Sequence, residues 1–572
     1  MTNWTILLDG SGIPDRAVIG GKAWSIARMA ALGLDVPPAF VISTKACLAY
    51  LENGDFLPGL VDEVEQGIAW LEARAGRRFG AGDQRLLLSV RSGAAVSMPG
   101  MMDTVLNLGI DDAGEAALAS ETGLPDFARD THRRFLELYS AIVLKAPVEL
   151  ERMGDPAAWR GAVSAAGGEV PGDVRSQLLG AIRAVFESWN TRRAKRYREH
   201  NGIPHDMGTA VTVQAMVFGN LDEESGTGVL FSRNPLAGEP VPYGEYLPRA
   251  QGEDVVSGKF TPLPLDAMRD HAPQAHAELL AASDLLEREN GDVQDIEFTV
   301  QSGRLYLLQS RSAKRAPAAA VRIAVDMVAE GRIDPATALS RVSAEQVATL
   351  LLPRLANGAA DNAEIAAQGE GACPGVASGV LVADADEAER RAAAGEAVIL
   401  VRATTSPDDV HGMIAAKGVV TEQGGSTSHA AVVSRALGRP CVVGVGVGAV
   451  ARAGQIVTID GAAGKVYLGA LPTERPREAD DAQLARLIEW ARERSSVAVI
   501  APESAPAGEG VDVDLLLADG SLESLGDALA GKASVRGSGL ANPEIARAAR
   551  RAGVTTMITE PVLPALLVAL EG

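Results

Sequence analysis

His429 lies in the segment of the chain that is richest in chemical information, residues 421–446, which read TEQGGSTSHAAVVSRALGRPCVVGVG. Two glycines end a predicted strand there, and Thr427 and Ser428 can cap the helix that is predicted to follow. We expect His429 at the N-terminus of that helix, exposed on a loop edge, where free backbone N–H groups and the helix dipole favour an anion. A neutral imidazole is a nucleophile near pH 7, because its unperturbed pKa is about 6.5. The segment is compatible with a histidine that carries a phosphoryl group and with one that only helps to cap the helix, and residue types alone favour the second interpretation.

A second set of chemically capable residues lies on a predicted β-hairpin, which reads DIEFTVQSGRLYLLQSR. Because side chains alternate between the two faces of a strand, Asp295 and Glu297 share one face, and Gln309 and Arg311 share a face of the second strand. Carboxylate and amide oxygens suit Mg²⁺, and a guanidinium suits phosphate oxygens. The hairpin predicts a site for a metal and a phosphate; the alternative is an exposed polar face.

Two further cations stand beside glycines in the first hundred residues. No GxxxxGK[ST] motif occurs in the N-terminal third of the chain, which argues against a Walker-type ATPase. Instead, Lys22 follows a glycine pair, and Arg91 ends a predicted strand ahead of a loop that contains Gly93 and Gly100. Such a loop can fold over a polyphosphate and present backbone N–H groups to it, although each signal alone is also compatible with an ordinary turn.

The elements that must position these residues divide the chain into four parts. Strands and helices mix through residues 1–315, and two helices are predicted in a linker over residues 316–370, the second capped by Ser343. Strands alternate with helices in a compact unit over residues 371–471. Residues 482–572 hold two or three βα-like units, SVAVIAP, DVDLLLAD and TTMITE among them. The predicted fold class is a multidomain protein of α/β and α+β type.

The composition of the chain argues against some classes of binding partner. The 572 residues carry a formal charge of −21, from 53 basic and 74 acidic residues, and this surface repels nucleic acid and anionic membranes. No apolar run of about 18 residues and no secretory signal is evident, so we expect no membrane span and a cytoplasmic location. The three cysteines lie far apart in the sequence, and the six histidines other than His429 fall at no metal-ligand spacing.

Longer strings link both sets of residues to one family. GGSTSHAAVVSRALGRPCVVG closely resembles the phosphohistidine signature of the dikinases that make or use phosphoenolpyruvate, and its Thr-Ser-His order is like that of the pyruvate phosphate dikinase family. Residues 18–315 resemble the ATP-grasp nucleotide-binding domain of that family. The strings that carry this resemblance include MDTVLNLG, THRRFLELY, GTAVTVQAMVFGN, SGTGVLFSRNP, YGEYLPRAQGEDVVSG and the hairpin. The SMPGMMDT loop favours the phosphate-dependent dikinase over the water-dependent synthase.

The resemblance implies roles for the hairpin residues. Asp295, Glu297 and Gln309 would hold Mg²⁺, and Arg311 would neutralise the transferring phosphoryl group. His429 would accept the β-phosphoryl group of ATP, while inorganic phosphate takes the γ-phosphoryl group, giving AMP and pyrophosphate. The phosphoryl group would then pass to pyruvate, giving phosphoenolpyruvate, or to another small acceptor.

It also implies roles for residues outside the hairpin. Lys22 and Arg91 would contact the ATP phosphates, Glu253 would lie by the nucleoside, and Arg134 would reach the phosphates as well. Thr427 matches a threonine that plant members use for regulation, but helix capping is the role that we favour for it here.

In this family a C-terminal (β/α)₈ barrel binds pyruvate and Mg²⁺. At about 30 residues per βα unit, residues 482–572 are too few to close eight strands, so we expect a form without that barrel. Three hypotheses remain open. The first is a kinase half that swivels on connectors in residues 313–370 to an acceptor site in a partner protein. The second is a self-contained phosphotransferase for a different small acceptor, and the third is a non-catalytic, nucleotide-sensing regulatory protein.

Overall fold

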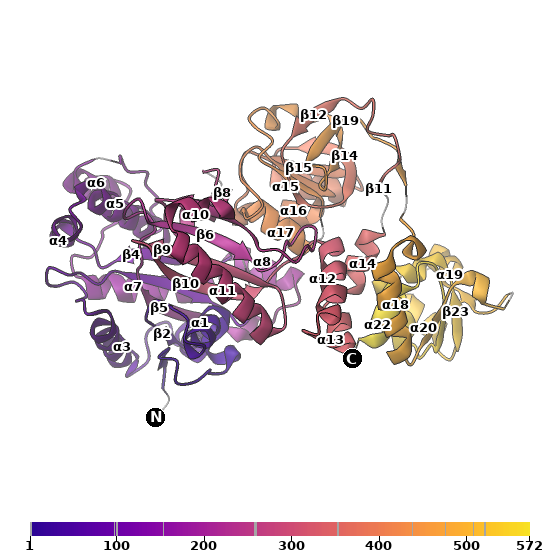
Figure 1. The fold of residues 1–572 in the computed structure, drawn as a ribbon, viewed down its shortest axis with the longest axis horizontal. Helices are drawn as coiled ribbons and strands as arrows, with labels where there is room; N and C mark the ends of the chain where they lie inside the picture. Colours follow the sequence, from indigo (N-terminus) through magenta and orange to yellow (C-terminus); the bar gives the residue numbers. More distant parts are fainter. Residues whose placement is uncertain are drawn as a thin grey trace.

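A computed structural model provides the fold of the chain. It describes residues 3–96, 98, 101–152, 154–256, 260–351, 354–437, 439–474, 476–506, 508–519 and 522–571. Gly100 and part of the SMPGMMDT loop therefore lie outside the described residues. Figure 1 shows an N-terminal unit (residues 3–315) at one end, an eight-stranded unit (residues 365–468) above the middle, and a C-terminal unit (residues 482–571) at the other end.

Two antiparallel sheets of five strands form the N-terminal unit. Their strands are rich in β-branched and aromatic residues, and all six residues of β5 are buried. In sheet order, the first sheet comprises β1 (Thr5–Leu7), β2 (Ala39–Ile42), β5 (Ala210–Ala215), β3 (Leu88–Gly93) and β4 (Thr104–Leu108). The second comprises β10 (Arg304–Ser312), β9 (Gln294–Gln301), β6 (Gly226–Phe231), β7 (Tyr243–Pro248) and β8 (Leu263–Pro264).

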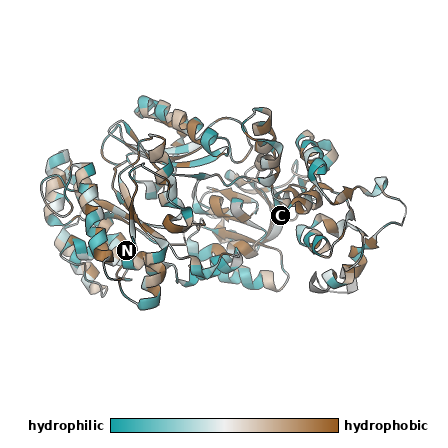
Figure 2. Ribbon diagram, turned by 90° about the horizontal axis from the view of Figure 1, so that it is seen from below, coloured by the Kyte–Doolittle hydropathy of each residue, from teal (hydrophilic) through white to brown (hydrophobic). Residues whose placement is uncertain are grey.

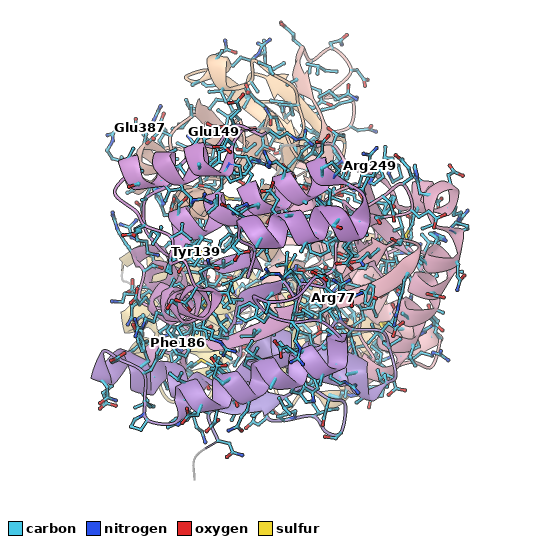
Figure 3. The ribbon with its side chains drawn as sticks, turned by 90° about the vertical axis from the view of Figure 1, so that its left-hand side faces the viewer. Arg77, Tyr139, Glu149, Phe186, Arg249 and Glu387 are labelled. Carbon is cyan, nitrogen blue, oxygen red and sulfur yellow. The ribbon has the colours of Figure 1, made fainter. Side chains whose placement is uncertain are left out.

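Helices cover these sheets and join them. The first sheet shares a core with α2 (Thr44–Asn53), α3 (Leu60–Ala75), α5 (Pro125–Ile142) and α7 (Val174–Ser188). Figure 3 labels two buried rings of that core, Tyr139 of α5 and Phe186 of α7. The second sheet packs on α11 (Pro273–Asn290), and α1 (Arg16–Ala31) contacts strands of both sheets. The smaller helices of the unit are α4 (Asp112–Thr122), α6 (Pro156–Ala165), α8 (Arg192–His200), α9 (Gly252–Val256) and α10 (Met268–His271).

The predicted hairpin is confirmed as β9 and β10, which are joined by a turn at Ser302 and Gly303, both with positive φ. Its register sets Glu297 opposite Gln309 and Asp295 opposite Arg311. Ile296 and Phe298 are fully buried in the core, as the alternation predicts.

A mixed sheet forms the eight-stranded unit, and its strands β14 to β17 run parallel. In sheet order the strands are β12 (Ile365–Gln368), β19 (Lys465–Leu468), β18 (Ile456–Asp460), β14 (Val376–Val382), β15 (Val398–Arg402), β16 (Gly418–Thr421), β17 (Cys441–Val443) and β13 (Glu370–Cys373). Its helices are α15 (Ala385–Ala393), α16 (Val410–Ala415) and α17 (His429–Leu437). The strands predicted at AVILV, GVVTE, PCVVGVG and IVTID are β15 to β18, as expected.

The connecting helices are α12 (Pro317–Ala329), α13 (Pro335–Ser340) and α14 (Ala344–Leu350), one more than predicted. Ser343 caps α14 as expected, in a capping box with Gln346. These helices share one apolar core with α18 (Ala482–Arg494) and α22 (Leu563–Leu570) of the C-terminal unit.

Four parallel strands form the sheet of the C-terminal unit, in the order β21 (Ala498–Ile500), β24 (Thr556–Ile558), β23 (Ser534–Arg536) and β22 (Val511–Asp512). Its remaining helices are α19 (Val513–Asp519), α20 (Leu522–Leu529) and α21 (Pro543–Arg551). The strand expected at DVDLLLAD is two residues long, because the chain turns into α19 at Val513 and buries that side chain.

Hydrophobic strands lie inside each unit and hydrophilic residues line the outer helices, as the brown and teal ribbon of Figure 2 shows. Among the described residues, no helix has the length and apolar character that crossing a membrane requires. The multidomain fold class of α/β and α+β type is confirmed. The boundaries 1–315, 316–370, 371–471 and 482–572 stay a prediction.

Candidate functional site

Two glycines bring Lys22 to the end of the strand that carries Arg91. Gly20 has a φ of 75° inside α1, and a Cβ at this position would lie 1.8 Å from the carbonyl oxygen of Gly93. Only glycine allows this approach, because any side chain would collide with backbone and would also be strained at this φ. A Cβ on Gly93 would lie 3.5 Å from the Cβ of Lys22, so the lysine stem lies directly beside β3.

The hairpin carboxylates meet the two predicted arginines. Nη2 of Arg91 donates to Oε2 of Glu297 at 3.2 Å, across the gap between the two sheets. Nε of Arg311 donates to Oδ2 of Asp295 at 2.8 Å, and its Nη2 lies 3.9 Å from Oε1 of Glu297. Four of the predicted residues therefore form one ionic cluster.

The charges of this cluster act on each other strongly. Burial and the neighbouring Arg91 and Arg311 together lower the pKa of Lys22 to about 7, against the opposing effect of Glu297. Burial alone would raise the pKa of Glu297, but Arg311, Arg91 and Lys22 outweigh it and hold this pKa below its usual value. Lys22 and the two arginines around two carboxylates suit a polyanion such as a nucleoside triphosphate.

The oxygens of this cluster fit Mg²⁺. Oδ1 of Asp295 and Oε1 of Gln309 are buried and accept no hydrogen bond. Buried oxygens without a donor are costly, and a hard cation with oxygen ligands would satisfy both. With Glu297 beside them, these residues are the ones that would hold the ion.

Arg134 and Glu253 form a second group. Nη1 of Arg134 lies 2.9 Å from Oε1 of Glu253 and 2.9 Å from Oδ1 of Asp254, while its Nε donates to Asp130 at 2.8 Å. The structure thus pairs the two predicted residues with each other, and the carboxylates that surround Arg134 offset the effect of burial and raise its pKa.

His429 is the first residue of α17, so the predicted position at a helix N-terminus is confirmed. The prediction that it is exposed on a loop edge is wrong, because Nε2 is shielded from solvent; this nitrogen also has no hydrogen-bond partner in the part of the chain that the structure describes. Nδ1 lies 3.2 Å from Oγ1 of Thr405. Burial lowers the pKa of His429 to about 4, although Asp409 opposes this, so the ring is neutral at pH 7.

Sequence reasoning missed Thr405, which lies after β15, while His429 lies in the segment after β16. Because the carboxyl ends of neighbouring parallel strands meet at one edge of a sheet, the two loops come together. When the threonine hydroxyl accepts from Nδ1–H, the lone pair of the imidazole is on Nε2. The contact is therefore compatible with the tautomer in which Nε2 is the nucleophile.

The eight-stranded unit is docked on the N-terminal unit through Glu245 of β7. This carboxylate accepts from Oγ of Ser426 at 2.9 Å and from the hydroxyl of Thr427. Tyr243 of the same strand donates to Ser426 at 3.0 Å. A Cβ at Gly425 would lie 2.7 Å from Oε1 of Glu245, so glycine is needed for this approach. Burial raises the pKa of Glu245, and its hydrogen bonds to the two hydroxyls counter this.

The predicted capping roles of Thr427 and Ser428 are wrong. Thr427 donates its hydroxyl to Glu245, and Oγ of Ser428 makes no hydrogen bond. The Thr427 hydroxyl donates to a carboxylate of the other unit instead of accepting from a backbone N–H group of its own helix, and single-segment reasoning does not include that carboxylate.

Two parts of the chain match models of known protein families. Residues 57–276 match the family model for the pyruvate phosphate dikinase AMP/ATP-binding domain, and residues 394–464 match that for the mobile domain of PEP-utilising enzymes. An ATP-binding domain with a docked mobile domain is therefore the class that the fold and site define.

Two similar proteins identify the family within this class. The chain is 44% identical over 529 residues to "Pyruvate, phosphate dikinase 1, chloroplastic" of Zea mays, covering 86% of this chain and 56% of that protein. It is 39% identical over 532 residues to "Pyruvate, phosphate dikinase" of Clostridium symbiosum, covering 86% of this chain and 60% of the relative. The chain belongs to the pyruvate phosphate dikinase family, and it spans little more than half the length of these relatives.

Replacing Thr405 tests the tautomer argument. In Thr405→Val, the shape is kept but the hydroxyl is lost, so formation of phosphohistidine should slow about twofold to tenfold, the worth of one hydrogen bond. Single-turnover labelling with ATP measures this rate. Thr405→Ser retains the hydroxyl and should stay near the wild-type rate; equal rates in the valine variant would contradict the assignment.

Glu245→Ala should weaken docking, because the two hydroxyls lose a charged acceptor. Each such bond contributes about 1.5–3 kcal/mol, so transfer to His429 should slow about 10- to 100-fold while the Kd for ATP is unchanged. Rapid-quench labelling and equilibrium dialysis measure the two quantities. Glu149→Ala removes an exposed glutamate, labelled in Figure 3, and serves as the control.

The lowered pKa of His429 predicts how stability depends on pH. Above pH 6.5 His429 is neutral in both the folded and the unfolded protein, so it does not change the free energy of unfolding. As pH falls from 6.5 towards 4, only the unfolded chain gains the proton, and the folded state is destabilised by up to about 2 kcal/mol at pH 5. The midpoint of thermal unfolding of the mobile domain should therefore fall more steeply between pH 7 and 5 in the wild type than in His429→Gln. Parallel profiles would refute the shift.

Proposed function

We propose that this chain transfers the β-phosphoryl group of ATP to Nε2 of His429, with inorganic phosphate as acceptor of the γ-phosphoryl group. The observation that carries this proposal is the state of that nitrogen: neutral at pH 7, without a hydrogen-bond partner, and held at the docked face of the mobile domain. A histidine that served only as a cap or a core residue would not leave a shielded ring nitrogen unpaired.

The residues of the N-terminal unit bind and orient the nucleotide. Lys22 and Arg91 neutralise the phosphates, and their charges also attract Glu297, which lies between Arg91 and Arg311. Mg²⁺, when bound by Asp295, Glu297 and Gln309, supplies charge neutralisation on the phosphate oxygens. Positioning and charge neutralisation account for most of the catalysis in phosphoryl transfer.

His429 acts as the nucleophile. The lone pair on Nε2 attacks the β-phosphorus, the bond from that phosphorus to the oxygen bridging to the α-phosphate breaks, and AMP leaves with the electron pair. Nδ1 keeps its proton, which Thr405 accepts as a hydrogen bond. The γ-phosphoryl group passes to inorganic phosphate, so ATP and phosphate yield AMP, pyrophosphate and phosphohistidine.

The onward acceptor is proposed from the relatives, whose names give pyruvate. Pyruvate, or another small acceptor, would take the phosphoryl group from His429 after the mobile domain leaves Glu245, at a site in a partner protein. A self-contained phosphotransferase for a different small molecule is the second candidate, and the C-terminal unit with its parallel sheet favours it. A nucleotide-sensing regulatory protein is the third.

Isotope labelling tests the proposal directly. The protein is incubated with ATP labelled at the β or the γ position, with and without phosphate, and label is measured on protein and on nucleotide. Retention of β-label on the protein with release of AMP supports the dikinase reaction. Release of ADP with γ-label on the protein points to a simple kinase, and absence of label supports a regulatory role. Adding pyruvate then tests the acceptor.

His429→Asn should abolish labelling and leave ATP binding intact, because the asparagine has no nucleophilic nitrogen and residue 429 is not part of the ionic cluster on the hairpin. Acid-labile, alkali-stable label on the protein is the measurement. His205→Asn, a change at an exposed histidine outside the mobile domain, is the control and should retain full labelling. Equal labelling of the His429 variant would refute the proposal.

A further inference from the structure

Two neighbouring helices of the mobile domain bring a histidine and two carboxylates together, away from His429. Asp386 and Glu389 lie one turn apart on α15, and His411 lies on α16. One ligand atom from each of the three side chains lies within 4.8 Å of the others. Sequence reasoning missed this cluster, because His411 is more than twenty residues from the two acids and fits no short metal motif.

The geometry of His411 is unusual for an ordinary ion pair. Its Nε2 lies 2.9 Å from Oδ1 of Asp386, yet it is shielded from solvent and makes no well-aligned hydrogen bond. Two ligands of one metal ion, each about 2.1 Å from it on adjacent positions, are about 3.0–3.4 Å apart without any need for such alignment. The separation of 2.9 Å is close to the lower end of this range, so an ion bound by both atoms would satisfy Nε2, which has no aligned hydrogen bond among the described residues.

The charges of α15 give an independent reason. Its arginines are paired elsewhere: Arg390 with Glu387, at 2.6 Å, and Arg391 with Glu396, at 2.5 Å. Among the described residues, Glu389 has no cationic partner, so two like charges one helical turn apart are left beside His411. Glu387, labelled at the rim in Figure 3, shows that this helix lies at the surface, where an ion can enter.

We propose that Asp386, Glu389 and His411 form a binding site for a divalent transition-metal ion of the Zn²⁺ class. An imidazole nitrogen with two carboxylate oxygens is a donor set typical of such ions, whereas Mg²⁺ prefers oxygen alone. The exposed Glu389 side chain closes the remaining gap by rotation, and water completes the coordination.

The ion would clamp α15 to α16. α16 directly follows the loop in which Thr405 orients His429 and Asp409 pairs with Arg402 at 3.1 Å. Binding to the folded state alone raises its stability, so the ion stabilises the part of the mobile domain that supports the carrier histidine.

Equilibrium dialysis of the full chain against ZnCl₂, with MgCl₂ in excess to occupy sites made of oxygen ligands, tests the proposal. We expect one Zn²⁺ per chain and a higher midpoint of thermal unfolding. His411→Gln and the double variant Asp386→Asn/Glu389→Gln should each weaken binding about tenfold or more and remove the thermal shift.

His205→Gln is the matched control, because the imidazole of His205 faces a single carboxylate, Glu199 at 3.8 Å. It should bind Zn²⁺ as the wild type does. Circular dichroism shows whether each variant folds, so lost binding is not confused with unfolding. Equal affinity in the wild type and both site variants, or no uptake of Zn²⁺ by the wild type, would overturn the site.

Discussion

The carboxylate of Glu245 is the constraint on which the arrangement of this molecule depends. The proposed phosphoryl transfer would need contact between His429 and a nucleotide held by the N-terminal unit, and the bonds from Ser426 and Thr427 to this carboxylate hold the two units together. Two charge-assisted hydrogen bonds contribute about 3–6 kcal/mol before the cost of burying the charge is taken off. This net strength suits a carrier that must dock and then leave, because a much tighter contact would hold the domain at the ATP site.

Close packing around that contact depends on glycine at two places. Gly425 lets the histidine loop approach Glu245, and Gly20 lets α1 approach the end of β3. At each position a Cβ would collide with the neighbouring group, and each glycine lies within four residues of a side chain, Lys22 or His429, for which we propose a role in binding or transfer. Apolar residues add to the same interface, since Met98 and Met101 of the N-terminal unit share a core with Ala430 and Ala431 of α17. The docked interface thus combines hydrogen bonds to Glu245 with an apolar contact.

Local patterns predicted the parts of the site that lie within one segment. The hairpin was predictable because strand alternation alone sets Asp295 and Glu297 on one face, and a helix start at His429 follows from its glycines and hydroxyl residues. Contacts between segments were not predictable. Thr405 reaches His429 only because two parallel strands are neighbours, and Cys373 and Cys441, far apart in sequence, lie opposite each other across β13 and β17. Thr427 was assigned to its own helix because its true acceptor, Glu245, lies in another domain.

The connections of the mobile domain limit how it can move. α12 is fixed at its end to the N-terminal unit by Arg233, which is 2% exposed and bonds Glu287 at 2.8 Å and Glu330 at 2.8 Å. α12 to α14 also share their core with the C-terminal unit, so these helices are a scaffold rather than a flexible tether.

Both connections between these helices or the C-terminal unit and the mobile domain instead run through one two-stranded ribbon, β11 (Arg354–Leu355) and β20 (Thr473–Glu474). An exposed ion pair joins its two strands. Exposed pairs contribute little, about 0–1 kcal/mol, so rotation about this ribbon costs less than separating α12 to α14 from their core. A swivel there would carry His429 away from Glu245 while leaving every core outside the docked interface intact.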